Sequence, residues 1–151
     1  MVEKILVPID MADQETGIKT IKEGVVQTRA REGELTVMTV VPNIMAGLDW
    51  RYAIRGSMQG SEDYDLKAIV KEALTQLNKL VEDHTPSGMK VKTIARHGTA
   101  YEEILEVAKD IGASMIVLGA HRPSLSDYLI GPTASRVVRH AECSVNVMRD
   151  T

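Results

Sequence analysis

Apolar residues along the chain follow two different periods, which alternate with each other. Five short runs rich in β-branched residues have the length of buried strands and lie at residues 2–8, 35–41, 89–95, 115–118 and 144–148. Between these runs, apolar residues recur every three or four positions, the spacing of amphipathic helices, at residues 18–25, 66–81, 104–111 and 134–141. The pattern predicts five strands that alternate with four helices.

This alternation predicts the fold class. Neighbouring parallel strands need a crossover connection, and right-handed helical crossovers place helices on both faces of a sheet. We therefore expect an α/β fold with a single doubly wound, five-stranded parallel sheet. The chain of residues 1–151 has the length of one domain. Two strand orders, 2-1-3-4-5 and 3-2-1-4-5, are compatible with the pattern.

Two local segments add detail to this picture. Gly98 ends the third strand, and the spacing of Thr99 and Glu102 is that of a capping box, which predicts that the third helix begins at residue 100. Residues 42–61 contain three glycines and no sustained apolar period, so they are expected to form a long loop. Such a loop is either a lid or partner surface, or a tolerated insertion.

Charge and composition narrow the function classes. The net charge is −3 without a block of like charges, which argues against binding to duplex DNA or to an anionic membrane surface. Aromatic residues make up only 3% of the chain, so base stacking on single-stranded nucleic acid is poorly supplied. With one cysteine, no basic leader and no apolar stretch of membrane-spanning length, the chain is expected to be cytoplasmic.

A ligand of such a sheet binds beyond the carboxyl ends of the strands, where the strand order reverses. In the order 3-2-1-4-5 this point lies between the first and fourth strands, which end in Pro8-Ile9-Asp10 and in Gly119-Ala120-His121-Arg122. The last helix then begins near Gly131-Pro132-Thr133. Free amides at a helix start favour phosphate, and glycine allows close approach. A plain connection with two turn glycines is the alternative reading of the same spacing.

Three segments carry a resemblance to a known family. Residues 5–10, ILVPID, residues 117–119, VLG, and residues 137–145, VVRHAECSV, resemble the universal stress protein family. The resemblance covers essentially the whole chain and is weakest at residues 42–61. It implies the strand order 3-2-1-4-5 and a homodimer joined partly through the last strand, Ser144 to Arg149. In one large subset of the family it also implies ATP at the crevice described above.

That subset is marked by the pattern Gly-x2-Gly-x9-Gly-(Ser/Thr), and this chain departs from it. Gly119 matches the first glycine, Arg122 occupies the second, and Gly131 matches the third after one deletion. Pro132 stands where Ser or Thr is expected, and Thr133 follows it. The version His121-Arg122-Pro123-Ser124 resembles the short-loop branch of the family, whose members still hold adenine nucleotides.

Transferred position by position, the resemblance also implies an adenosine side of the site. Pro8 and Asp10 would face the adenosine, Val40 would offer a backbone contact to adenine, and Gly98 would lie near the ribose. Each has a structural alternative. In the alternative interpretation, Asp10 caps the first helix or the turn before it. Without the resemblance, Val40 would be interpreted as a core residue.

The remaining candidate chemistry is sparse. His121 and Arg122 have no nucleophile placed beside them by spacing, so anion contact or exposure is expected. His84, His97 and His140 lack metal-ligand spacing, and Cys143 reads as a partly buried thiol without a role. Asn146 places an amide in the proposed dimer strand, which either is satisfied across the interface or weakens it.

The function expected from these residues is regulatory. The chain is read as a stress-response protein that binds ATP or AMP, with Mg²⁺ optional and little or no catalysis. Two other functions stay open: a slow ATP-hydrolysing or nucleotide-transferring enzyme, and a ligand-free dimeric interaction module. The enzyme reading lacks the Ser-Gly-Gly-x-Asp-Ser phosphate loop after the first strand, where this chain has Asp10-Met11-Ala12-Asp13.

Overall fold

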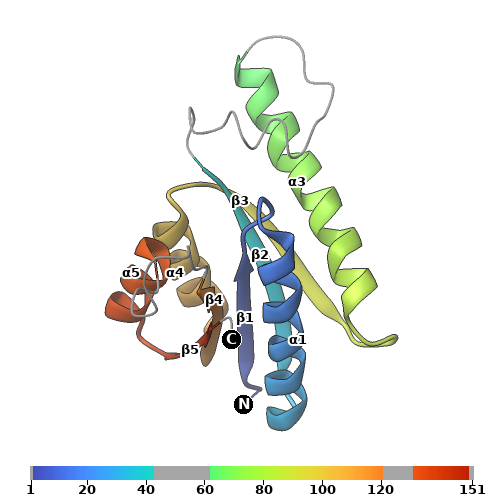
Figure 1. The fold of residues 1–151 in the computed structure, drawn as a ribbon, viewed down its shortest axis with the longest axis vertical. Coiled ribbons are helices and arrows are strands. Elements are labelled where there is room, and N and C mark those ends of the chain that lie inside the picture. The colour runs from blue at the N-terminus through green and yellow to red at the C-terminus, as the bar shows by residue number, and fades with distance from the viewer. Residues whose placement is uncertain (1, 43–61, 121–130, 150–151) are drawn as a thin grey trace.

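The protein is a five-stranded parallel sheet flanked by helices (Figure 1). The computed structural model describes residues 2–42, 62–120 and 131–149. Its elements, in chain order, are β1 (Lys4–Ile9), α1 (Gln14–Arg31), β2 (Glu34–Pro42), α3 (Glu62–His84), β3 (Val91–Gly98), α4 (Ala100–Ile111), β4 (Met115–Ala120), α5 (Pro132–His140) and β5 (Ser144–Arg149). The predicted fold class is confirmed, with the strand order β3-β2-β1-β4-β5.

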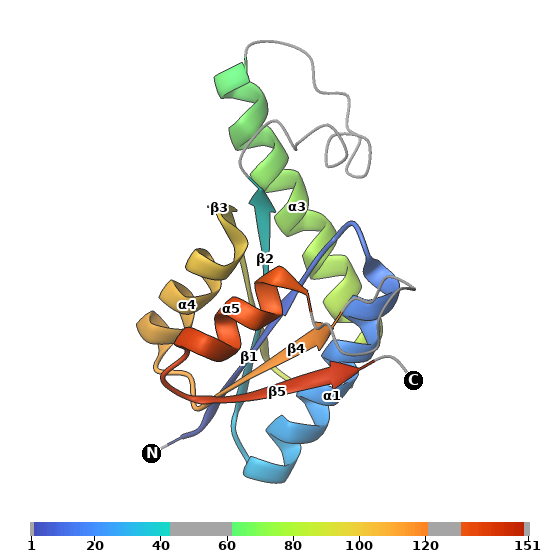
Figure 2. The same ribbon diagram turned by 60° about the vertical axis from the view of Figure 1, so that its left-hand side comes forward.

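Helices cover both faces of the sheet and form two separate cores. Ile5, Val7 and Val37 pack with α1 and α3 on one face. On the other face, Leu6 and Ile116 pack with α4 and α5. Figure 2 shows α4 and α5 together on one side of the sheet, with α1 and α3 behind it. Because successive side chains of a strand point to opposite faces, the strands that are buried on both faces are continuously apolar rather than alternating.

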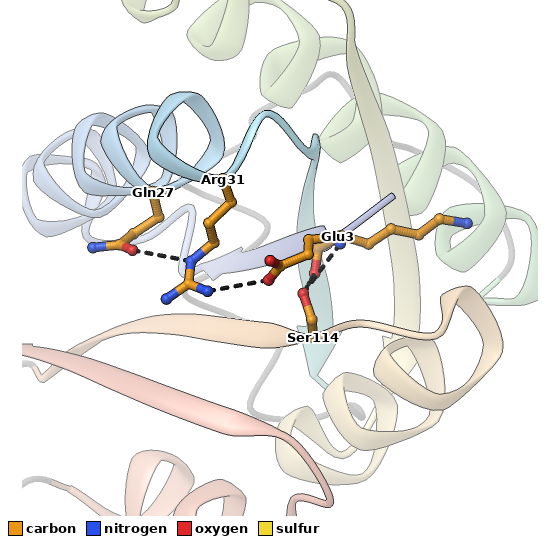
Figure 3. Close-up of polar contacts among 5 residues, drawn as sticks. Glu3, Gln27, Arg31 and Ser114 are labelled. Atoms are coloured by element: carbon orange, nitrogen blue, oxygen red, sulfur yellow. Dashed lines mark hydrogen bonds and ion pairs between the residues drawn. The ribbon is translucent and has the colours of Figure 1, made fainter. Parts of the chain in front are cut away.

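Polar contacts fasten the amino end of the sheet (Figure 3). The Ser114 amide donates to the Lys4 carbonyl at 2.8 Å, and the Ser114 hydroxyl both donates to that carbonyl and accepts from the Lys4 amide, each at 3.2 Å. On the neighbouring helix, the Arg31 guanidinium contacts Glu3 Oε1 at 3.1 Å and Gln27 Oε1 at 3.4 Å. The start of β4 and the end of α1 are thus both tied to the start of β1.

The start of α4 lies where the sequence predicts it, but the capping box is not made. Thr99 is the N-cap residue, in an extended conformation, and its side chain forms no capping hydrogen bond. The Glu102 carboxylate instead accepts from the Tyr101 hydroxyl at 3.4 Å. The turn into α4 depends on Gly98, whose φ of 147° is unfavourable for other residues and whose missing Cβ leaves room for the Glu103 carboxylate.

Two other expectations concern a loop after the second strand and membrane-spanning segments. The loop expected at residues 42–61 lies outside the described residues, apart from Pro42, which ends β2. No helix among the described residues combines the length and the hydropathy that crossing a bilayer requires.

Candidate functional site

Strand pairing is incomplete at the topological switch point of the sheet, between β1 and β4. β1 pairs with β2 over its whole length, from Lys4↔Glu34 to Ile9↔Thr39. β4 likewise pairs with β5 up to Ala120↔Arg149. Between β1 and β4, however, the register holds only Ile5↔Met115 and Leu6↔Ile116. The two strands are therefore not paired with each other toward their carboxyl ends, which is the place where ligands of open α/β sheets bind.

The direction of the backbone groups explains why this ladder stops. The Glu3 carbonyl accepts from the β2 residue Glu34 at 2.9 Å, whereas the Lys4 carbonyl accepts from Ser114, the residue before β4. Because backbone groups alternate along a strand, even-numbered residues of β1 face β4. In the register Leu6↔Ile116, the Leu6 backbone faces Met115 and Val117, so position 8 would have to donate the next rung to the Val117 carbonyl. Pro8 has no N–H to donate, so the rung cannot form.

The start of α5 supplies a second feature of this end of the sheet. Gly131 is the N-cap residue with φ 87°, and Pro132 is the first helical residue. The missing N–H of Pro132 leaves the amides of Thr133 and Ala134 as the free donors of the first turn. The first turn of α5 holds no acidic residue, whereas α1 has Glu15 there. The positive end of the α5 dipole is therefore not neutralised by its own first turn, which favours an anion.

Asp10 lies directly after β1 and is exposed. Its Oδ1 accepts a hydrogen bond from the Ala12 amide at 2.9 Å, and its carbonyl accepts from the Asp13 amide at 2.9 Å. The side chain therefore stabilises the turn that precedes α1, while Asp13 is the N-cap residue and accepts from Thr16 at 3.4 Å. One oxygen of Asp10 is used by the turn, and a carboxylate has further acceptor capacity for a ligand.

Val40 lies one strand away, at the carboxyl end of β2. Its side chain is half-buried against the core beneath α4 and α5. The Glu34 amide donates to β1, so even-numbered β2 residues direct their backbone toward β1. The ladder ends at Ile9↔Thr39, so the Val40 carbonyl lies one step past the last pair and has no β1 strand residue opposite it. Val40 is therefore both a core residue and a potential backbone contact.

The two strand-end glycines have different surroundings. Gly98 pairs with Pro42 on the edge strand β3, two strands from β1, or about 10 Å at ordinary strand spacing. A Cβ on Gly119 would come within 2.6 Å of the side chains of Thr16 and Thr20 on α1. Gly119 is thus required by helix packing, while its backbone groups, by the same alternation, face β1 across the unpaired part of the switch point.

Among the residues expected at the site, the structure brings Pro8, Asp10, Val40 and Gly119 to one end of the sheet, with α5 beginning after Gly131. Gly98 lies at the same end but farther out. His121 and Arg122 lie outside the described residues. Within the described ranges, no three His, Cys, Asp or Glu side chains gather in a way that could hold a metal ion.

Two residues outside this site were also singled out in the sequence. Burial raises the pKa of the Cys143 thiol, which makes its nucleophilic thiolate scarcer. The Asn146 amide donates to Glu23 Oε2 on α1 at 3.3 Å, so it finds a partner within its own chain.

One participant in the site is not evident from motif reading. The Val117 carbonyl is significant only because Pro8 faces it, and that depends on the register between two strands far apart in the sequence. A signal for it does exist in the chain, since proline is rarely tolerated in a central strand and its presence there marks an interrupted ladder.

Comparisons with known proteins agree with this architecture. The chain matches the model of the universal stress protein family over residues 1–149. Universal stress protein G of Escherichia coli O157:H7 is 28% identical over 149 residues, which cover 99% of this chain and 100% of that protein. Among solved structures, the universal stress protein UspA from Lactobacillus plantarum superposes with a TM-score of 0.65 at 26% identity, covering 97% of each chain.

Two more distant solved structures contain a nucleotide. A universal stress protein from Archaeoglobus fulgidus in complex with dAMP has a TM-score of 0.57 at 17% identity and covers 97% of this chain and 98% of its own. A universal stress protein in complex with cAMP has a TM-score of 0.61 at 15% identity and covers 98% and 97% of the two chains. At these identities the likeness shows the fold.

Proposed function

Because the chain belongs to the universal stress protein family, we propose that it is a stress-response regulatory protein that binds an adenine nucleotide, ATP or AMP. The observation that carries the proposal is the interrupted ladder between β1 and β4, which leaves the carboxyl ends of these strands unpaired. The free amides at the start of α5 follow β4 in the chain. An unpaired switch point followed by a helix start is suited to a nucleotide.

The proposed site has an adenosine side and a phosphate side. On the adenosine side, the free acceptor capacity of Asp10 would take a ribose hydroxyl, and the Val40 carbonyl would accept from the adenine amino group. Pro8 and Gly98 would border the adenosine. On the phosphate side, the amides of Gly119, Gly131 and Thr133 would donate to phosphate oxygens. Arg122 and His121 would add charge there, and Pro132 would set the start of α5.

The nucleotide-bound relatives support this choice of ligand class. The structures with dAMP and with cAMP share the fold of this chain over nearly its whole length. Both ligands contain adenine and a phosphate. The distribution of features here, with acceptors after β1 and β2 and donors before α5, suits the same two chemical parts. Mg²⁺ would be optional, bound through the phosphates.

The proposal includes little or no catalysis. Its regulatory part requires only that the nucleotide bind one state of the protein better than another. We also take residues 1–151 to form one domain, located in the cytoplasm, in which the ligand affects shape or partner affinity. Release of phosphate or AMP at rates above those of a blank incubation would contradict this part of the proposal.

Calorimetric titration and thermal unfolding with ATP, AMP, adenosine and GTP test the binding itself. A ligand at about 100 times its Kd stabilises the folded state by about 2.7 kcal/mol, so the melting temperature should rise with ATP or AMP and much less with GTP. Absence of both heat and stabilisation at millimolar ATP and AMP would refute the proposal.

A variant of Asp10 tests the position of the site. Asp10→Asn keeps an oxygen that can accept from Ala12, so the turn before α1 is retained, but it removes the charge. It should weaken ATP, AMP and adenosine alike. Asp83→Asn is the matched control, because Asp83 is exposed and lies in the last turn of α3. It should change none of these affinities.

A further inference from the structure

β1 and β4 are hydrogen-bonded to each other at their amino ends and are not paired at their carboxyl ends. At the amino end, Ser114 makes three hydrogen bonds with the Lys4 backbone (Figure 3). At the other end, β1 continues to Ile9 and β4 continues to Ala120, yet the ladder stops after Leu6↔Ile116. The strands therefore cease to pair before either of them ends.

One missing donor lies at the point of separation. The next rung needs an N–H at position 8 and the carbonyl of Val117, and the rung after it needs the Pro8 carbonyl and the Gly119 amide. Pro8 cannot supply the first of these. On its other side, β1 keeps full pairing with β2, including Pro8↔Met38, because the backbone groups of Val7 and Ile9 make that ladder. The proline therefore interrupts one ladder and leaves the other intact.

We propose that Pro8 is a positioning residue that holds the carboxyl ends of β1 and β4 apart by withholding a backbone donor from Val117. The separation of the strands then results from the missing N–H of Pro8 and does not depend on a bound ligand. A residue with an N–H at position 8 would extend the ladder by the Val117 rung and then by the Gly119 rung. The extension would occupy the Gly119 amide, which the proposed function assigns to the ligand, so the consequence for binding rests on that function.

Pro8→Ala supplies the donor directly, and Pro8→Val is a second variant that suits a buried strand better. Amide hydrogen exchange measured by NMR reports on each rung. In both variants the new amide at residue 8 should exchange at least about a hundredfold more slowly than in an unfolded chain. The Gly119 amide should exchange more slowly than it does in the wild type. ATP affinity should fall about tenfold, the value of one net hydrogen bond that the ligand must displace.

Pro86→Ala is the matched control, because it also replaces a proline by alanine but lies in the turn before β3, where its carbonyl accepts from Met89. It should change neither Gly119 exchange nor ATP affinity. Fast exchange at residue 8 in the variants, or a protected residue 8 with wild-type ATP affinity, would overturn the proposal. If the wild type binds no nucleotide, the proposed function fails, and exchange at residues 8 and 119 still decides whether Pro8 holds the strands apart.

Discussion

At the scale of single residues, three residues near the switch point are distinguished by a missing atom or group. Pro8 lacks a donor, and Gly119 lacks a Cβ that would collide with Thr16 and Thr20 on α1. Pro132 lacks a donor at the first position of α5. In our proposals, the proline at position 8 keeps β1 and β4 unpaired, whereas the proline at position 132 removes one amide from the helix start that would bind phosphate. This second loss calls for another phosphate contact.

Arg122 is the residue expected to make that contact, since it follows β4 by two positions and stands where the ATP-binding subset of the family has a glycine. A guanidinium can grip a phosphate with two charge-assisted bonds worth about 1.5–3 kcal/mol. Arg122→Ala should therefore weaken ATP binding roughly tenfold to a hundredfold and leave adenosine nearly unchanged. Arg122→Lys should recover part of the loss, because lysine restores charge but not two-pronged geometry.

Titration of the wild type and both variants with ATP, AMP and adenosine measures this directly. Arg139→Ala, at an exposed position of α5, is the control for a general change in charge. Equal losses for all three ligands, or no loss for ATP, would show that Arg122 does not read phosphate.

The sequence motifs predicted that Pro8, Asp10, Val40 and Gly119 follow or end strands at the same edge of the sheet, and the structure places them there. For Asp10 the sequence left two roles open, a nucleotide contact and a cap of the turn before the first helix, and the structure confirms that its carboxylate accepts a hydrogen bond in that turn. Thr99 was correctly placed at a helix start, yet its capping bond is absent. Such side chains can bond to several neighbouring backbone groups, and the sequence alone does not decide between these competing partners.

At the scale of elements, α1 lies very close to the sheet because small residues face it. A Cβ on Gly24 would come within 2.4 Å of Val7 Cγ2 and 3.3 Å of Leu35 Cδ1, both on fully buried residues. Nearer the start of the same helix, a Cβ on Gly17 would lie 3.3 Å from the Ile9 side chain. The approach of α1 to β1 also brings its first turns against β4 at Gly119, next to the proposed site.

Gly24→Ala should destabilise the fold although it improves helix propensity. Alanine gains about 1 kcal/mol over glycine inside a helix, whereas overpacking a filled core costs about 1–3 kcal/mol. The cost of the clash should exceed the gain in helix propensity, because Val7 and Leu35 are fully buried in the core. Urea unfolding should show a lower midpoint for Gly24→Ala, and a smaller change for Gly17→Ala.

A double-mutant cycle isolates the cause. Val7→Ala removes the methyl group that the new Cβ would meet, so Gly24→Ala should cost less in the Val7→Ala background than in the wild type. Additive effects in this cycle would mean that the two side chains do not compete for space.

Elements were the easiest level to predict. All five strands and four helices expected from the apolar periods are present, with boundaries that differ by one to three residues at most strand ends, because burial on both faces makes parallel strands continuously apolar. The strand order was not determined by the pattern and came from the family resemblance. The register between β1 and β4 is a tertiary property, so the proline in a central strand signals an interrupted ladder but not which carbonyl of β4 it faces.

At the scale of the whole molecule, the sheet has two edges, β3 and β5. Across the β3 edge region, the Arg96 guanidinium joins β3 to α4 through Glu103, Glu106 and Asp110 at 3.3, 2.9 and 3.5 Å. The β5 edge pairs with β4 on one side only. An unpaired strand edge favours association with a second copy, so we propose a homodimer joined through Ser144 to Arg149.

The structure indicates which backbone groups such a dimer would use. In the register Leu6↔Ile116, the even-numbered residues of β1 bond to the odd-numbered residues of β4, so within β4 the backbone of Ile116 and Leu118 faces β5. The register Ile116↔Val145 then directs the backbone of Asn146 to β4 and that of Val147 to the free edge. The Asn146 side chain, held by Glu23, does not require a partner across the interface.

Val147→Pro should therefore produce a monomer without unfolding the protein. It removes a donor from the free edge and leaves the β4 ladder intact, which is the position in which a strand tolerates proline. Asn146→Pro, one residue earlier, should instead break the ladder to β4 and lower stability, while Val147→Ala controls for the lost side chain and should stay dimeric. Light scattering measures the oligomeric state, and circular dichroism reports whether each variant is folded. A protein concentration of roughly tens of micromolar suits the experiment, because a dimer of micromolar Kd is populated there. A monomeric wild type, or a Val147→Pro variant that remains a dimer, would rule out pairing through β5.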